Sequence, residues 1–269
     1  MANYDIILWD WNGTLIDDVK QSVESITPSL IKRNLYVPTI DEYRKLFRFP
    51  VIDYYKDLGF DFDKEPFNMV ANEYTNLYAT KKYEPNLFKE VKEVLAVLKS
   101  KGLRQYILTA SEKSIVEESL AHYNIAKYFE SVAGCDNTLA HGKIDIGKNL
   151  IAKNNLHGKI LMIGDTVHDY EVAKSLKIDC VLITGGHNLK ENLIKTGIPV
   201  LDNRYQLYRI IFPELYKKEP IKDINGSNIE INKDAFEDDV KRFSEINDFS
   251  TKYKAFYDDI KMTNKTEDW

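Results

Sequence analysis

This chain has little cysteine, no long hydrophobic run and no excess of positive charge. Its two cysteines, Cys135 and Cys180, are too few for the disulfide framework of a small secreted domain. We expect reduced, buried thiols, and a single disulfide stays open. No segment approaches the ~18 apolar residues that span a bilayer, so no membrane partner is expected. The formal net charge of −5 provides no electrostatic basis for binding nucleic acid.

A signal peptide is also missing from the start of the sequence. Asp5 and Asp10 interrupt the first apolar stretch, and no basic segment precedes it. We therefore expect a cytoplasmic protein. With 43% hydrophobic and 29% charged residues, the composition is that of an ordinary globular protein. A length of 269 residues suggests one to two domains with a sizeable core.

Short apolar runs alternate with helical patterns along most of the chain. Expected strands end near residues 9, 109, 133, 164, 184 and 201, and amphipathic segments separate several of them. This alternation is typical of βαβ units around a parallel sheet. The sequence therefore predicts an α/β protein with a Rossmann-like core formed by residues 1–16 and 84–213.

Two segments depart from this alternation. Between residues 17 and 83, apolar and aromatic residues recur at helical spacing with no convincing strand, which predicts a helical insertion. Residues 214–269 begin with a polar stretch and continue with Phe236, Phe243 and Phe249 at helical spacing. We expect a helical C-terminal extension that packs on the core, because these rings would otherwise form costly exposed surface. A partner-binding arm is the alternative.

Polar residues gather at the expected carboxyl ends of the strands, which is where open parallel sheets bind ligands. Asp10 follows the first strand, and Asn12, Gly13 and Thr14 follow it at once. A carboxylate in this place can attack phosphorus and form an aspartyl phosphate. We therefore expect a nucleophile at Asp10.

Further polar residues follow later strands. Thr109 and Ala110 end the second strand, Lys143 lies near the start of a helix, and Asp165 and Asp169 lie in the loop after a buried strand. Mg²⁺ is usually held by one or two carboxylates together with phosphate and water. A hydroxyl and an ammonium group can hold the remaining phosphate oxygens. Each motif alone is weak evidence for a phosphoryl-transfer site, but their occurrence in this order after successive strands is strong evidence for one.

In these motifs the chain resembles the haloacid dehalogenase-like hydrolases, over about residues 1–213. The resemblance implies a Mg²⁺-dependent phosphatase that acts on a small phosphorylated metabolite through an aspartyl phosphate. It also implies that the insertion at residues 17–83 is a cap that selects substrate, as in phosphoglycolate phosphatase-like members. The substrate itself and the oligomeric state are not decoded by the sequence.

The resemblance assigns a role to each motif residue. Asp10 is implied as nucleophile and metal ligand, the backbone carbonyl of Asn12 and Asp165 as metal ligands, and Asp169 as a further ligand or as support for the ligands. Thr109 and Ala110 are implied to bind phosphate. Lys143 is implied to hold both the phosphate and the charge of Asp10, with Lys148 as a rival at poorer spacing.

Asn12 departs from the family pattern, which has a second aspartate as general acid and base at this catalytic position. An amide cannot exchange a proton, and general acid–base catalysis is worth about 100- to 10,000-fold, or ~3–5 kcal/mol of barrier. We therefore expect an enzyme with slow turnover rather than one without activity. A substrate with a good leaving group could compensate, or a histidine could donate the proton, with His168, His141 and His187 as candidates.

Two other functions remain in view. A non-catalytic phosphoryl-binding or switch protein on the same fold would hold an aspartyl phosphate without turning it over. A phosphoacceptor receiver domain also uses Asp, Thr and Lys around Mg²⁺, but its acceptor normally lies on a middle strand of a chain about half this length. The retention of every other motif favours the phosphatase.

Overall fold

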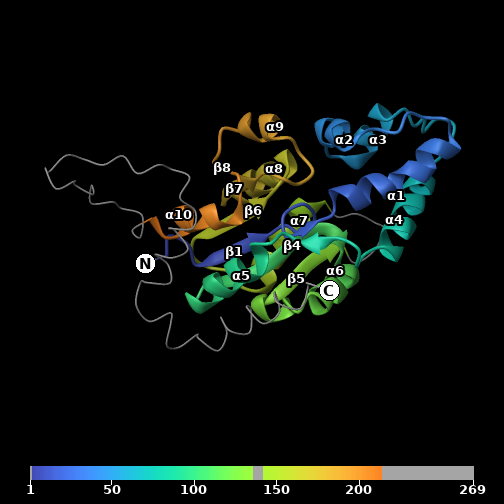
Figure 1. The fold of residues 1–269 in the computed structure, drawn as a ribbon. Coiled ribbons are helices and arrows are strands. Elements are labelled where there is room, and N and C mark those ends of the chain that lie inside the picture. The colour runs from blue at the N-terminus through green and yellow to red at the C-terminus, as the bar shows by residue number, and fades with distance from the viewer. Residues whose placement is uncertain (1, 136–141, 214–269) are drawn as a thin grey trace, which may run out of the picture. The chain divides into compact units, whose positions relative to one another are not determined.

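A six-stranded parallel sheet is the centre of the computed structural model, which describes residues 2–135 and 142–213 (Figure 1). Its order is β5-β4-β1-β6-β7-β8, with every neighbouring pair parallel. The strands are β1 Ile6–Trp9, β4 Arg104–Glu112, β5 Ser131–Cys135, β6 Ile160–Gly164, β7 Asp179–Ile183 and β8 Val200–Leu201. The chain builds outward from β1 to β5 and then returns to the other side of β1 with β6. The ends of β1, β4 and β6 therefore lie at the switch point where such sheets bind ligands.

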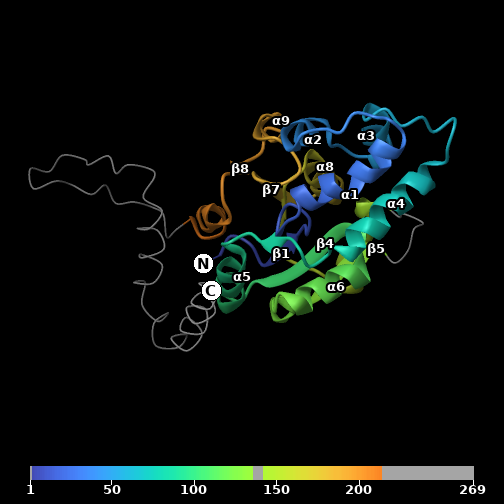
Figure 2. The same ribbon diagram turned by 45° about the vertical axis from the view of Figure 1, so that its right-hand side comes forward.

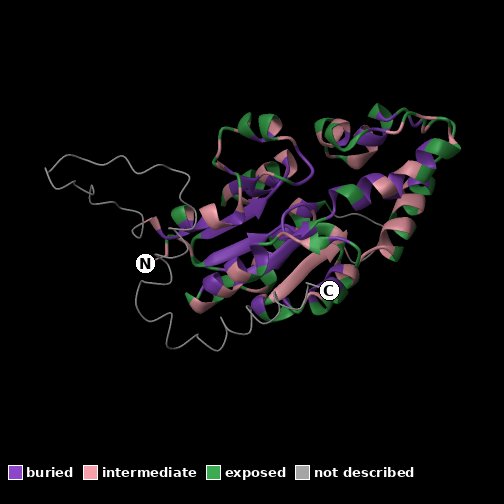
Figure 3. Ribbon diagram, viewed as in Figure 1, coloured by how far each residue is buried: buried purple, intermediate pink, exposed green. Residues whose placement is uncertain are grey.

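The central strand is buried on both faces because helices cover the sheet on both sides. All four residues of β1 are fully buried. Ile6 and Leu8 pack with Leu150 of α7 and Val172 of α8. The helices that follow the core strands are α5 Val91–Ser100, α6 Lys113–His122, α7 Lys143–Lys153, α8 Val167–Leu176, α9 Lys190–Ile194 and α10 Leu207–Ile211, with 3₁₀ turns at Ala126–Tyr128 and Arg204–Gln206. Figure 3 shows the buried central strands beside the less buried edge strand β5.

Four helices occupy the segment between the first two core strands. They are α1 Val19–Lys32, α2 Ile40–Leu46, α3 Val51–Asp57 and α4 Phe67–Thr80. Figures 1 and 2 show α1 and α4 side by side, beyond the carboxyl ends of the sheet strands. A short antiparallel pair, β2 Ile16–Asp17 and β3 Asn86–Leu87, closes the two ends of this helical insertion. The insertion has its own core, with Ile26, Leu30 and Val70 among its buried residues.

The expected α/β fold with a parallel sheet and an intervening helical segment is confirmed, with local differences. Strand β4 continues to Glu112, because it pairs again with β5 at Cys135 after an irregularity that follows Leu108. Thr109 and Ala110 therefore lie within this strand rather than at its end. Cys135 and Cys180 are not joined by a disulfide, and both are only partly buried. The division into domains stays a prediction, and the expected extension at residues 214–269 lies outside the described residues.

None of the helices in the described part of the chain is long and apolar enough to cross a membrane.

A buried polar link ties the central strand to its neighbour. The indole N–H of Trp9 donates to Oε1 of Gln105 at 3.0 Å, and Nε2 of Gln105 donates to the carbonyl of Leu95 at 2.9 Å. Both side chains are fully buried. An unpaired polar group in such a place costs about 1–3 kcal/mol.

We expect Gln105→Met to lower the free energy of unfolding by ~1–3 kcal/mol for each of the two groups that it leaves unpaired. Urea denaturation of the full chain measures this loss. Lys148→Met is the control, because Lys148 is exposed and pairs with the exposed Asp145 in the same helix, so its change should stay within about 0.5 kcal/mol. Equal stability of Gln105→Met and the wild type would contradict the importance of this link.

Candidate active site

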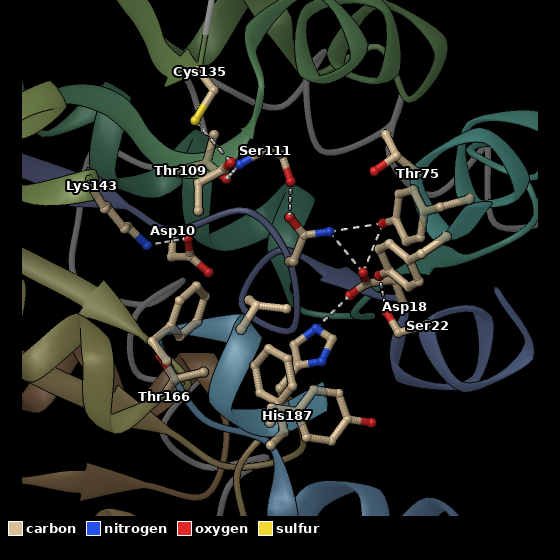
Figure 4. Close-up of a pocket in the computed structure, with 18 of the residues that line it drawn as sticks. Asp10, Asp18, Ser22, Thr75, Thr109, Ser111, Cys135, Lys143, Thr166 and His187 are labelled. Carbon is tan, nitrogen blue, oxygen red and sulfur yellow. Dashed lines mark hydrogen bonds and ion pairs between the residues drawn. The ribbon is translucent and has the colours of Figure 1, made fainter. Parts of the chain in front are cut away.

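Three carboxylates and one lysine meet at the ends of the central strands. Asp10 follows β1, Asp165 follows β6, Asp169 lies in the first turn of α8, and Lys143 is the first residue of α7. One oxygen of each carboxylate lies within 4.8 Å of the others. Lys143 Nζ donates to Asp10 Oδ1 and, at 2.6 Å, to Asp169 Oδ1. Figure 4 shows the side chains of Lys143 and Asp10 pointing toward one another. All four groups are buried.

The local structure of α8 fixes the place of Asp169. Thr166 caps this helix, and Asp169 completes a capping box, as its Oδ2 accepts from the Thr166 backbone at 3.0 Å and hydroxyl at 2.7 Å. Its other oxygen accepts from Lys143. Both oxygens of Asp169 are therefore engaged, and this side chain positions the lysine.

Hydrogen bonds to both carboxylate oxygens fix the side chain of Asp165. The Thr14 hydroxyl donates to its Oδ1 at 2.9 Å, and the backbone N–H of His187 donates to its Oδ2 at 2.6 Å. The loop of Gly186 passes so close that a Cβ there would collide with the Asp165 carboxylate. The backbone approaches this carboxylate where only glycine leaves room.

The charges of this cluster do not balance. Burial raises the pKa of Asp10 well above its usual range and that of Asp165 to about 6. Burial also opposes the charge of Asp169, but the ammonium of Lys143 and its hydrogen bond outweigh it and lower the pKa of Asp169. One ammonium group thus faces three buried carboxylates. A divalent cation that prefers oxygen ligands, such as Mg²⁺, suits this donor set.

The candidate phosphate-binding residues lie beside this cluster. Thr109 and Ala110 line the same cavity as Asp10 and Lys143. The Thr109 hydroxyl accepts from the backbone N–H of Ser111 at 3.1 Å. Lys148, the rival lysine, is exposed and pairs with Asp145 on the surface of α7. The structure therefore brings Lys143, and not Lys148, to Asp10.

Asn12 is anchored by hydrogen bonds on both ends of its amide. Its Nδ2 donates to Asp18 Oδ2 at 2.7 Å and to the Tyr78 hydroxyl at 2.8 Å, and its Oδ1 accepts from the Ser111 hydroxyl at 2.6 Å. Tyr78 in turn donates to Asp18 Oδ2 at 2.7 Å. An aspartate at position 12 could not donate to Asp18, so this neighbour favours the amide.

Asp18 and His187 form a second buried ion pair. His187 Nε2 lies 3.2 Å from Asp18 Oδ1, and the Gly13 backbone N–H donates to the same oxygen at 2.8 Å. Burial alone would lower the pKa of His187 and raise that of Asp18, which favours the neutral form of each side chain. The pairing outweighs it, so the pKa of His187 rises to about 9 and that of Asp18 falls below its usual range. Asp18 thereby holds both Asn12 and the turn at Gly13, whose φ is +68°.

Sequence reasoning missed two residues that shape the nucleophile loop. Asp18 was visible only as one of two adjacent acids, Asp17 and Asp18, with nothing to distinguish it. Arg204 is buried and donates to the carbonyls of Thr14 at 3.0 Å and Gly13 at 3.2 Å. It lies 190 residues from that loop in the chain, so no local signal pointed to it.

The structure separates the three histidines considered as proton donors. His187 lines the cavity, but its ring nitrogens are bonded to Asp18 and, at 2.7 Å, to the Tyr43 hydroxyl. His168 stacks on Phe49 at 4.3 Å and pairs with Glu171, and it does not line the cavity. His141 lies outside the described residues.

Asp10, Asn12 and Lys143 line a cavity of about 360 Å³ between the sheet and the helical insertion. Its floor carries Asp10, Thr109 and Lys143, and its far walls come from α1 to α4 and the segment between α2 and α3. Pockets of 300–1,000 Å³ are typical of small-molecule sites.

Comparison with known proteins places the chain among related enzymes. The family model described as haloacid dehalogenase-like hydrolase matches residues 7–183. The tyrosine-protein kinase PtkA of Mycobacterium tuberculosis is 26% identical over 199 residues, covering 73% of this chain and 67% of the relative. A phosphoglycolate phosphatase of Colwellia psychrerythraea is 28% identical over 209 residues, covering 72% and 90%. A haloacid dehalogenase-like hydrolase of Streptococcus pneumoniae shares the fold, with a TM-score of 0.68 at 20% identity over 77% of this chain and 97% of the other.

Two tyrosines in the cavity wall differ in their hydrogen bonding. Tyr43 and Tyr54 are both buried, and the Tyr43 hydroxyl is bonded to His187. Within residues 2–135 and 142–213, the Tyr54 hydroxyl has no hydrogen-bond partner. We expect Tyr43→Phe to lower the free energy of unfolding by about 1–3 kcal/mol, because it leaves a buried ring nitrogen unpaired.

Tyr54→Phe is the matched control and should leave stability unchanged or raise it by up to about 1 kcal/mol, since it removes a buried, unpaired hydroxyl. Urea denaturation of both variants makes the comparison. The reverse order of stabilities would disprove this account of the wall.

Proposed function

We propose that this chain, which belongs to the haloacid dehalogenase-like hydrolases, is a Mg²⁺-dependent phosphatase of a small phosphorylated metabolite. One observation carries the proposal: Asp10 lies buried on the floor of a cavity, paired with Lys143 and close to the carboxylate of Asp165. The similarity to a phosphoglycolate phosphatase supports hydrolysis of a phosphate ester.

Asp10, Asp165 and the backbone carbonyl of Asn12 would hold the metal, with Asp169 as a further ligand or as support through Lys143. The unbalanced carboxylates of this cluster fit a divalent cation. When bound, Mg²⁺ supplies positive charge to the phosphoryl oxygens.

The protein side chains divide the reaction into two displacements. A carboxylate oxygen of Asp10 attacks phosphorus, and the bond from phosphorus to the leaving oxygen breaks. Water then attacks the phosphorus of the aspartyl phosphate, which releases phosphate and restores Asp10. Lys143 and the Thr109 hydroxyl, with the adjacent backbone at Ala110, hold the phosphoryl oxygens, and the charge of Lys143 opposes the rise in the pKa of Asp10 that burial causes.

Asn12 takes no proton in this scheme and acts by position. Its amide is held by Asp18, Tyr78 and Ser111. The leaving oxygen therefore departs without a proton from position 12, which slows esters of poorly acidic alcohols most. The expected chemistry is hydrolysis with a strong dependence on the leaving group.

Metal binding can be tested without turnover. We expect millimolar Mg²⁺ to raise the melting temperature of the full chain, because binding to the folded state alone stabilises it, by about 2.7 kcal/mol at 100 times Kd. Differential scanning fluorimetry measures the shift. Asp165→Asn should lose most of it, whereas Asp145→Asn, on the exposed face of α7, should keep it. Equal shifts in both variants would place the metal elsewhere.

The Asn12–Asp18 contact allows a direct test of whether an aspartate at position 12 would act as the general acid. In Asn12→Asp the new carboxylate faces Asp18, so we expect lower stability and no gain in turnover. In the double variant Asn12→Asp/Asp18→Asn the amide moves to position 18, and each hydrogen bond described above for these two side chains keeps a donor and an acceptor. We expect this exchange to raise kcat on alkyl phosphates by about 10- to 1,000-fold over wild type.

Phosphate release from alkyl and aryl phosphates measures the exchange, with Asp10→Asn as the inactive reference. A double variant no faster than wild type would show that position 12 does not supply the proton. Labelling of Asp10 that stops after one equivalent in the wild type, without release of phosphate, would instead favour a phosphoryl-binding switch.

A further inference from the structure

We propose that the outer part of the cavity binds an uncharged aromatic ring, so that the substrate is the phosphate ester of an aromatic alcohol or phenol. This inference rests on the proposed function and names the substrate class of the same site. Two independent features support it: the rings that form the wall, and the lack of an unpaired cation among the described residues that line the cavity.

Aromatic side chains of the helical insertion dominate the wall opposite Asp10. This aromatic wall comprises Tyr43, Phe47, Phe49, Tyr54, Tyr55, Tyr74 and Tyr78. Phe47 is its centre, with ring centroids 5.2 Å from Tyr43 and 5.3 Å from Tyr54. Phe47, Phe49, Tyr74 and Tyr78 line the cavity and are only partly buried. Rings prefer to meet other rings edge to face or offset, as these already do.

The cations that line the cavity are already neutralised. Within the part of the chain that the structure describes, they are Lys143, which is paired with Asp10 and Asp169, and His187, which is paired with Asp18. Glu112 adds a further acid to the lining. A leaving group with its own carboxylate or second phosphate would meet acids and rings without an unpaired cation, and desolvating such a charge is costly.

The state of Asn12 points to the same substrates by a separate route. Because its amide gives no proton to the leaving oxygen, a phenol leaves far more readily than an aliphatic alcohol. Ring binding and leaving-group acidity are therefore separate properties, and the experiment must separate them.

Four synthetic esters and one natural one do so in the presence of Mg²⁺. Benzyl and cyclohexylmethyl phosphate both release aliphatic alcohols and differ mainly in the aromatic ring. Phenyl and cyclohexyl phosphate differ also in leaving-group acidity. We expect kcat/KM to favour benzyl over cyclohexylmethyl phosphate by about 2- to 12-fold, the value of an aromatic contact. Phenyl over cyclohexyl phosphate should differ by at least ~100-fold. Phosphoglycolate, with its carboxylate, should be the poorest substrate.

Phe47→Leu tests the aromatic wall directly. It should bring the ratio of benzyl to cyclohexylmethyl phosphate near one, through KM more than kcat. Phe62→Leu is the matched control, because Phe62 packs against Phe60 and Phe67 in the insertion, and none of these three residues lines the cavity. It should leave the ratio as in the wild type.

Binding of benzylphosphonate and cyclohexylmethylphosphonate, which cannot be hydrolysed, separates the two proposals. Tighter binding of benzylphosphonate than of cyclohexylmethylphosphonate, lost in Phe47→Leu, supports the aromatic site even if no ester is hydrolysed. The absence of hydrolysis would then overturn only the proposed phosphatase activity. Turnover without preference for the ring, or with phosphoglycolate preferred, overturns the aromatic site and leaves the phosphatase standing. Equal binding of both phosphonates also overturns it.

Discussion

The burial of Lys143 between Asp10 and Asp169 is the interaction on which the candidate site depends. A buried ammonium group is stable only when opposite charges surround it, and breaking such a pair by removing one partner typically costs about 3–5 kcal/mol. The contact joins the end of β1 to the first turns of α7 and α8. It thereby ties three segments far apart in the chain to one point at the edge of the sheet.

The second buried pair, Asp18 with His187, has a comparable role at the boundary with the helical insertion. Asp18 is the residue immediately before α1, and His187 belongs to the loop after β7 that also donates to Asp165. Asn12 fits between these groups as a donor to Asp18. The substitution that looks in the sequence like the loss of a catalytic acid is, in the structure, one half of a buried carboxylate–amide contact.

Strand-end motifs predicted much of the site because their logic is local. An apolar strand followed by an acid can be recognised in a few residues, and parallel strands bring such ends to one edge. Asp10, Lys143, Asp165 and Asp169 accordingly meet, although their roles in catalysis stay predictions. Thr109 shows the limit of this logic, since its strand continues to Glu112 by renewed pairing with β5. Pairing across strands, and not the local sequence, decided where that strand ends.

The sequence by itself determined the order of strands and helices, the helical character of the insertion, and the acids and lysine available for chemistry. These follow from hydrophobic periodicity and residue type, which act over a few neighbours. Only the tertiary structure decided the environment of Asn12, the support of the nucleophile loop by Arg204, and the aromatic wall with its neutralised cations. Such contacts join residues up to 191 positions apart. Whether a charge is paired, or a ring faces a cavity, depends on what the fold brings beside it.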